Sequence, residues 1–226
     1  PFRKRTPRAT LPGTVGRRDM TTIWGRASSS NVMKLLFLCE ELGIPVTRKD
    51  AGGSFGVTRE AAYLAMNPMA RVPTLEEADG FTLWESNTIL RYLCATRGGE
   101  ALHPAEPRAR AAVEKWMDWQ LAHLNEPMTT ILFTLFRTPE PQRNLERLAR
   151  AVAAAEEYWT IVEATLAGRD WLAGGAMTLA DIALAPYLHR WLHFPVERRE
   201  RPSLLAWHAR LMGRPGFARH VAVPLA

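Results

Sequence analysis

The sequence predicts an α/β half followed by an all-helical half. From residue 21 to about residue 97, the apolar residues alternate between a period of two and a period of 3.6, which is typical of strands interleaved with helices. Residues 98–107 contain glycines and prolines that predict a linker, and helical spacing dominates after them. With 226 residues, the chain is long enough to bury a core in each half. We therefore expect an α/β domain at 20–97 and a helical domain at 108–226.

The α/β half begins with a strand, a polar turn and a helix. Residues 21–25 predict the strand, and the segment from Ser28 to Asn31 supplies residue types that begin helices. Apolar side chains then recur at helical spacing over residues 32–42, and Gly43 is placed to end the helix.

The rest of this half predicts a strand, a short helix, a hairpin and a closing helix. Asn67-Pro68 is expected to end the short helix, and Asp79-Gly80 is a favoured pair for the tight turn of a hairpin. The elements are expected, in order, at 44–49 (strand), 59–66 (helix), 72–75 and 81–84 (hairpin), and from Ser86 to about 98 (helix).

Three helical segments stand out in the second half. One long helix carries apolar residues from Val113 to Leu124, and Pro127 should bend it because proline disrupts the helical hydrogen bonding. An alanine- and glutamate-rich stretch at 141–166 predicts the next. Thr178-Leu179-Ala180-Asp181 then predicts a capping box, with Asp in place of the usual Glu.

Composition excludes several classes of protein. No run of about 18 apolar residues is present, so a membrane-spanning helix is not expected. Cys39 and Cys94 lie 55 positions apart in apolar segments, which favours packed thiols in a reducing, cytoplasmic setting over disulfides or zinc ligands. His189 and His193 share a helix face, but no acidic residue completes a metal site, and we expect none.

The net charge of +6 is concentrated at the start of the chain. Residues 1–19 carry six basic side chains and one acidic one, whereas the remainder is nearly neutral. We interpret 1–19 as a disordered basic leader or tag ahead of Met20, with a nucleic-acid-binding or lipid-binding arm and a targeting peptide as alternatives. Nucleic acid and membrane are therefore not expected as partners of the folded part.

The turn between the first strand and the first helix is the first candidate for chemistry. It places Ser29 and Asn31 at a helix N-terminus, where unpaired N–H groups and the helix dipole stabilise an anion or a thiolate. The alternative is that the serine simply caps the helix.

Two further segments point to a peptide-like ligand. If the peptide bond before Pro73 is cis, the backbone of Val72 turns outward and pairs with an extended ligand; a plain edge strand is the alternative. Ser86 is placed to cap the next helix and hold a carboxylate, while Glu85 faces an ammonium group. A ligand with an α-carboxylate and an α-amine fits this pair, although capping alone would also explain Ser86.

In this order and at these spacings, the motifs resemble those of the cytosolic glutathione S-transferases. The resemblance covers about residues 21–226, and within the family the sequence is most similar to the bacterial glutathione transferase B group. It implies a thioredoxin-like domain that binds glutathione, a helical domain that completes a hydrophobic second-substrate site, and a homodimer. The motifs that carry it are Ser29-Ser30-Asn31, Asn67-Pro68, Val72-Pro73, Glu85-Ser86 and Thr178-x-x-Asp181, with the group-specific segments 24–26, 84–87 and 114–119 and the tail around Pro224.

The resemblance also implies roles for individual residues. Val72 would pair with the cysteinyl backbone of glutathione next to a cis Pro73, and Glu85 and Ser86 would hold the γ-glutamyl end. The sulfur would then lie against the first turn. Classes of the family differ in the group that faces the sulfur, and this chain has no tyrosine before residue 63 and no cysteine in the turn. That leaves a serine, with Ser29 favoured and Asn31 as its assistant or rival.

The sequence departs from the family pattern after the second strand. Related serine-type enzymes often place His or Lys there for the glycine carboxylate, whereas residues 51–55 contain neither; Arg71, Arg48 and Lys49 are the candidates to replace it. Candidates for the second-substrate wall are Arg26, Trp116, Trp119, His123, Phe133 and Arg137. Core packing is the alternative for the aromatic residues among them.

We therefore expect an enzyme that ionises glutathione, its co-substrate, for attack on a small halogenated or otherwise activated electrophile. A glutathione-dependent reductase of disulfides or peroxides is one alternative, although the missing turn cysteine argues against thiol exchange. A non-catalytic protein of this fold that binds hydrophobic ligands or a protein partner is the other.

Overall fold

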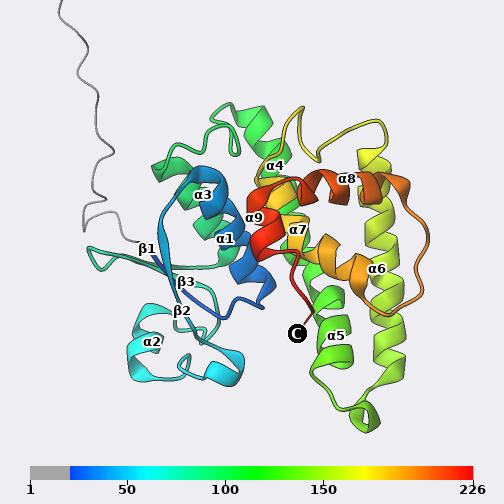
Figure 1. Ribbon diagram of the computed structural model, residues 1–226, viewed down its shortest axis with the longest axis horizontal. Helices are drawn as coiled ribbons and strands as arrows, with labels where there is room; N and C mark the ends of the chain where they lie inside the picture. Colours follow the sequence, from blue (N-terminus) through cyan, green and yellow to red (C-terminus); the bar gives the residue numbers. More distant parts are fainter. Residues whose placement is uncertain (1–20, 226) are drawn as a thin grey trace, which may run out of the picture.

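The computed structural model describes residues 21–225, and the predicted leader at 1–19 lies outside this range. A four-stranded sheet of order β2-β1-β3-β4 organises the first half (Figure 1). Strand β1 (Thr21–Trp24) pairs in parallel with β2 (Val46–Lys49) and antiparallel with β3 (Thr74–Glu77), which pairs antiparallel with β4 (Thr82–Trp84). A parallel strand–helix–strand unit followed by a hairpin is the thioredoxin-like arrangement that the family resemblance implies.

Helix α1 (Ser30–Leu42) connects β1 to β2 and lies toward the helical half in Figure 1. Every residue from 30 to 39 except Asn31 is buried, as expected for a helix with apolar residues on more than one face. The helix ends at Gly43, whose φ of 64° lies in the left-handed region that favours glycine.

The loop that leads into β3 is fixed by side chains from helix α2 (Ala61–Met66) and the residue after it. Asn67 donates to the carbonyl oxygen of Arg71 at 2.9 Å and to the hydroxyl of Thr74 at 3.0 Å. The Tyr63 hydroxyl contacts the same two oxygens, at 2.7 and 2.8 Å. The Val72–Pro73 bond is cis, as one of the two alternatives expected. Strand β3 begins only at Thr74, because proline has no N–H to donate to the sheet.

Helices form the second half, as predicted, and Figure 1 shows them beside α1. Helix α3 closes the first half, and a short η2 turn lies between β2 and α2. The remaining helical elements of the two halves are η2 Gly53–Phe55, α3 Ser86–Thr96, α4 Pro107–Trp119, η3 Gln120–Leu124, α5 Asn125–Phe136, η4 Glu140–Gln142, α6 Leu145–Leu166, α7 Leu179–His193, α8 Pro202–Met212 and α9 Pro215–His220. No helix within residues 21–225 is both long and apolar enough to cross a membrane.

Two boundaries differ from the sequence prediction for local reasons. The helical run expected to bend at Pro127 contains a π-helical segment, η3, which ends at Leu124 and accommodates a proline that cannot donate to the residue four positions back. Helix α6 begins at Leu145 and not at 141, because the Asn144 side chain accepts a hydrogen bond from the Arg147 N–H at 2.8 Å and thereby caps it.

The predicted capping box is present at the start of α7. Asp181, which is 0% exposed, accepts from the Thr178 N–H at 2.8 Å, from the Leu172 N–H at 3.1 Å and from the Trp207 indole at 3.1 Å. This one carboxylate therefore ties the start of α7 to the preceding loop and to α8.

Replacing Asp181 with alanine should lower the free energy of unfolding by roughly 3 kcal/mol or more, because several buried donors lose their acceptor. Denaturant unfolding followed by tryptophan fluorescence measures the change. Glu146→Ala is the control, since its ion pair with Arg150 is exposed and contributes less than about 1 kcal/mol. Equal losses in the two variants would contradict this role for the capping box.

Candidate active site

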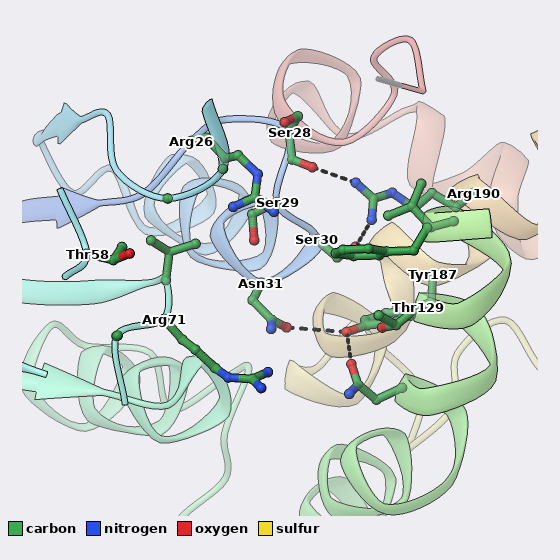
Figure 2. Close-up of a pocket in the computed structure, with 17 residues that line it drawn as sticks. Arg26, Ser28, Ser29, Ser30, Asn31, Thr58, Arg71, Thr129, Tyr187 and Arg190 are labelled. Carbon is green, nitrogen blue, oxygen red and sulfur yellow. Dashed lines mark hydrogen bonds between the residues drawn. The ribbon is translucent and has the colours of Figure 1, made fainter. Parts of the chain in front are cut away.

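A cavity of about 430 Å³ lies between the turn after β1 and the helical half. Figure 2 shows side chains from both halves converging on it. The first half contributes Arg26, Ser28, Ser29, Ser30, Asn31, Gly52, Gly53, Thr58, Ala70, Arg71 and Val72, and the second half contributes Asn125, Thr129, Leu132, Phe133, Tyr187 and Arg190.

Ser29 occupies the N-cap position of α1, but its hydroxyl makes no capping hydrogen bond. Its backbone is extended, with φ −84° and ψ 125°, and its side chain borders the cavity. The simple capping role that the sequence left open therefore does not hold. The hydroxyl and the N-terminal end of α1 are instead available to a ligand, and both favour negative charge there.

Asn31 is held by groups from two other helices. Its Oδ1 atom accepts from the Ser86 hydroxyl of α3 at 3.3 Å. The Tyr187 hydroxyl of α7 lies 3.3 Å from the same oxygen and 2.8 Å from Oδ1 of Asn125 (Figure 2). The carbonyl end of the Asn31 amide is thereby directed toward Ser86 and Tyr187.

Arg190 of α7 reaches across to the turn that carries Ser29. Its guanidinium donates to the Ser28 carbonyl oxygen at 2.6 Å and also to the Ser30 hydroxyl (Figure 2). Burial lowers the pKa of Arg190 to about 10, which leaves it charged at neutral pH. The helical half thus fixes the position of the turn and adds a positive charge beside it.

The cavity is electropositive. Arg26, Arg71 and Arg190 line it, and no carboxylate is among the lining residues. Burial lowers the pKa of Arg26, and repulsion from Arg137 acts in the same direction. Uncompensated guanidinium groups in a concave site favour an anionic ligand.

Glycines make room for one of these arginines. A Cβ atom on Gly52 would lie 3.1 Å from the Arg26 guanidinium, and one on Gly53 would lie 3.2 Å from its side-chain stem. Both glycines have positive φ angles, 74° and 64°. The segment in which the sequence lacks His or Lys therefore accommodates a cation from the neighbouring turn.

The segment around Ser86 differs from its expected geometry. Glu85, not Ser86, is the N-cap residue of α3, with a φ of 71°, and Ser86 is the first residue of the helix. The Ser86 hydroxyl therefore does not cap α3 and points to Asn31. Val72 borders the cavity, whereas Pro73, Glu85 and Ser86 are not among its lining residues.

Of the three basic residues considered for the glycine carboxylate, only Arg71 lines the cavity. Arg48 donates to the Gly25 carbonyl oxygen at 3.0 Å and pairs with Asp50. Lys49 lies over the Trp24 ring, 4.4 Å from its centre.

Of the residues expected at a second-substrate wall, Arg26 and Phe133 border the cavity, whereas Trp116, Trp119, His123 and Arg137 are not among its lining residues. Trp116 and Trp119 stack edge to face with centroids 5.3 Å apart, and Trp119 and His123 both contact Tyr158. Trp116 is part of the hydrophobic core, which agrees with core packing, the alternative to a role in the second-substrate wall. Arg137 acts on the site through its charge, which lowers the pKa of Arg26 and of Arg190.

Sequence reasoning missed the helical-half residues Arg190, Tyr187 and Asn125. A signal for Arg190 exists, because it is a charged residue at the end of an otherwise apolar run in α7. Nothing local distinguishes Tyr187 or Asn125, whose partners lie on other elements.

Neither cysteine borders the cavity. Both are free and buried, as predicted, and burial raises the pKa of each thiol to about 12. Over residues 21–225, no cluster of three or more His, Cys, Asp or Glu side chains is arranged to hold a metal ion.

Comparison with known proteins agrees with this geometry. The family model "Glutathione S-transferase, N-terminal domain" matches residues 28–96, and "Glutathione S-transferase, C-terminal domain" matches residues 124–215. The chain is 36% identical over 208 residues to glutathione S-transferase GstB of Escherichia coli K12. The aligned region covers 92% of this chain and 100% of that protein.

Solved structures give the same result. The theta class glutathione S-transferase of Xanthomonas axonopodis pv. citri with glutathione bound is 40% identical, with a TM-score of 0.87 over 91% of this chain and 99% of that one. A glutathione S-transferase of Pseudomonas fluorescens Pf-5 is 28% identical, with a TM-score of 0.80 over 91% and 98%. The chain belongs to the glutathione S-transferase family, in agreement with the resemblance noted in its sequence.

Replacing Arg190 with lysine should weaken glutathione binding about tenfold or more, because lysine keeps the charge but lacks the planar fork that reaches two oxygens of the turn. Calorimetric titration with glutathione measures the effect. Arg143→Lys is the matched control, since Arg143 donates to the carbonyl oxygens of Leu135 and Thr138. An equal loss in the control would show that the effect is not specific to the turn.

Proposed function

We propose that this glutathione transferase ionises the glutathione thiol at Ser29 and directs the thiolate to an electrophilic carbon of a small halogenated or otherwise activated compound. The thiol proton passes to solvent, a carbon–sulfur bond forms, and the bond to the halide or other leaving group breaks. The observation that carries the proposal is the Ser29 hydroxyl, which lies at the N-terminus of α1, borders the cavity and is not used as a cap.

The available interactions are large enough for this task. Lowering a thiol pKa from about 8.5 to about 6.5 requires roughly 2.7 kcal/mol of preferential stabilisation of the thiolate. A hydrogen bond to a charged group contributes about 1.5–3 kcal/mol, and a helix N-terminus adds about 0.3–1 kcal/mol. The Arg190 guanidinium, held against the turn, acts in the same direction.

The neighbouring groups suit the rest of glutathione. The backbone of Val72, beside the cis Pro73, is proposed to pair with the cysteinyl unit. Glu85 and Ser86, at the start of α3, are proposed to hold the γ-glutamyl end, and Arg71 the glycine carboxylate. A ligand with two carboxylates and a thiolate matches the positive charge of the cavity.

The electrophile is proposed to bind on the side of the cavity formed by α5. Leu132 and Phe133 supply apolar surface there, and Phe133 is 50% exposed. Arg26 borders the same cavity and provides a cation for a developing negative charge on the leaving group. The proposed role is the detoxification of such compounds in the cytoplasm, which the two free, reduced cysteines suit.

Replacing Ser29 with alanine should lower the fraction of bound glutathione that is ionised at neutral pH. Loss of one charge-assisted hydrogen bond corresponds to a roughly tenfold to hundredfold smaller ionisation constant. Absorbance near 240 nm during a pH titration of the saturated complex measures the thiolate, and conjugation of an activated haloarene measures the turnover.

Asn31→Ala is measured alongside it, and Ser54→Ala, in the exposed η2 turn, is the matched control. Retention of the thiolate in Ser29→Ala together with its loss in Asn31→Ala would assign ionisation to the asparagine. A wild-type complex without thiolate at neutral pH would contradict the catalytic proposal and favour the non-catalytic binding protein.

We also propose that the protein works as a homodimer, as the family resemblance implies. Apolar side chains such as Phe55, Met69 and Phe81 are exposed on the first half, with 52%, 54% and 42% of their surface accessible, and a partner subunit would cover surface of this kind. Light scattering coupled to gel filtration should give twice the mass of one chain. The mass of a single chain at micromolar concentration would contradict the dimer.

A further inference from the structure

Lys34 of α1 is a buried basic residue to which the proposed reaction gives no role. It lies one helical turn after Asn31 and is 0% exposed. Its ammonium group donates to Oε1 of Gln120 at 2.7 Å, to Oδ1 of Asn87 at 3.1 Å and to the hydroxyl of Ser86 at 3.5 Å. Each of the three ammonium protons therefore has an acceptor oxygen, two of them on α3 and one on η3.

All three acceptors of Lys34 are neutral. Within residues 21–225 no ion pair joins Lys34 to a carboxylate, and its nitrogen lies 5.2 Å from the centre of the Tyr187 ring. Burial lowers the pKa of Lys34 to about 7, and the carboxylate of Glu85 acts in the opposite direction. A buried ion of this kind is costly compared with an apolar side chain, so stability of the core does not explain its presence.

The charge fixes the direction of the hydrogen bonds around it. Oδ1 of Asn87 and Oε1 of Gln120 can only accept from Lys34, and in the protonated form the third N–H of Lys34 is donated to the Ser86 oxygen. The single proton of the Ser86 hydroxyl is then free for Oδ1 of Asn31, 3.3 Å away. Lys34 thus makes Ser86 a donor toward Asn31.

This direction determines which end of the Asn31 amide faces the ligand. An amide has one accepting and one donating end. With Oδ1 turned to Ser86 and Tyr187, the nitrogen remains for the cavity that Asn31 borders. Figure 2 shows the oxygen of Asn31 facing Tyr187 and the nitrogen on the opposite side of the amide. The reverse orientation would place a carbonyl oxygen against a thiolate and repel it.

We propose that Lys34 is a positioning residue for the transferase reaction, which acts through Ser86 to hold the Asn31 amide with its N–H groups toward the glutathione sulfur. The inference rests on the proposed function, because it requires a thiolate next to the Ser29 turn. It gives Asn31 the role of second hydrogen-bond donor to that thiolate, beside Ser29. Lys34 itself contacts neither substrate.

The test replaces Lys34 with methionine, which has a similar length but no charge and no donor. In the saturated glutathione complex, the ionisation constant of the bound thiol should fall about tenfold, as for the loss of one hydrogen bond. The value of kcat at neutral pH should fall by a similar factor, whereas KM for glutathione changes much less. Lys115→Met, on the exposed side of α4, is the matched control and should behave as wild type.

Asn31→Ala provides the background that separates positioning from a general structural effect. If Lys34 acts through the asparagine amide, Lys34→Met has no further effect on thiol ionisation once that amide is removed. An effect of equal size in both backgrounds would overturn the proposal, and so would wild-type ionisation in a folded Lys34→Met protein. Circular dichroism and the melting temperature show whether each variant is folded.

Ser86→Ala gives a second route, since it retains Lys34 and breaks the link to Asn31. It should reduce thiol ionisation at saturating glutathione, and the double variant with Lys34→Met should be no worse than the stronger single variant. Wild-type ionisation in Ser86→Ala would overturn the relay. The failures of the two proposals are distinguishable, because loss of the thiolate in Ser29→Ala supports the proposed function whatever the Lys34 variants do.

Discussion

The structure depends on the way α1 is buried while its N-terminal end stays open. The helix packs against α3 of its own half and against α7 and α9 of the other, so its position is determined from several sides. Its first turn is held from outside by Arg190, which binds the Ser28 carbonyl oxygen across the boundary between the halves. A helix end fixed in this way can keep its N–H groups and the Ser29 hydroxyl directed at a ligand without using them for its own capping.

Polar groups at the boundary between the halves form a connected set. Asn31 accepts a hydrogen bond from the Ser86 hydroxyl of α3, and the Tyr187 hydroxyl of α7 lies within hydrogen-bonding distance of both Asn31 and Asn125. If the Ser86 proton is directed to Asn31, the serine has no other hydroxyl proton for the γ-glutamyl carboxylate. The free N–H groups of the first turn of α3 are then the donors for that carboxylate, which is a normal use of a helix N-terminus.

Much of the fold could be predicted from the sequence because its signals are local. The helical spacing of residues 32–42 and the Thr178–Asp181 capping box each specify an element from neighbouring residues, and both are present. The start of α6 was predicted too early, because the capping residue Asn144 lies inside a stretch of good helix formers. The π-helical segment before Pro127 could not be read from spacing, since a bend and a local change of hydrogen bonding satisfy proline equally well.

The site was less predictable because part of it comes from the helical half, far along the chain from the first turn. Ser29, Asn31, Arg71 and Val72 follow local motifs, and the structure brings them to one cavity. Arg190 meets the turn over a separation of 162 residues, which no local pattern encodes. The aromatic residues Trp116 and Trp119 have helical spacing whether they wall a cavity or fill a core, and only the packing decides between these roles. Basic residues within apolar runs, such as Lys34, were the signal that remained unused.

The two buried thiols have a consequence for how the protein withstands its own substrates. Cys39 and Cys94 lie in the core, and their raised pKa keeps them protonated at physiological pH. A protonated thiol is a poor nucleophile, because the thiolate is the reactive form. Under the proposed function, an electrophile that enters the cavity meets the sulfur of bound glutathione, because no cysteine lines the cavity. The burial and protonation of Cys39 and Cys94 would then protect the chain's own cysteines from the electrophiles it is proposed to turn over.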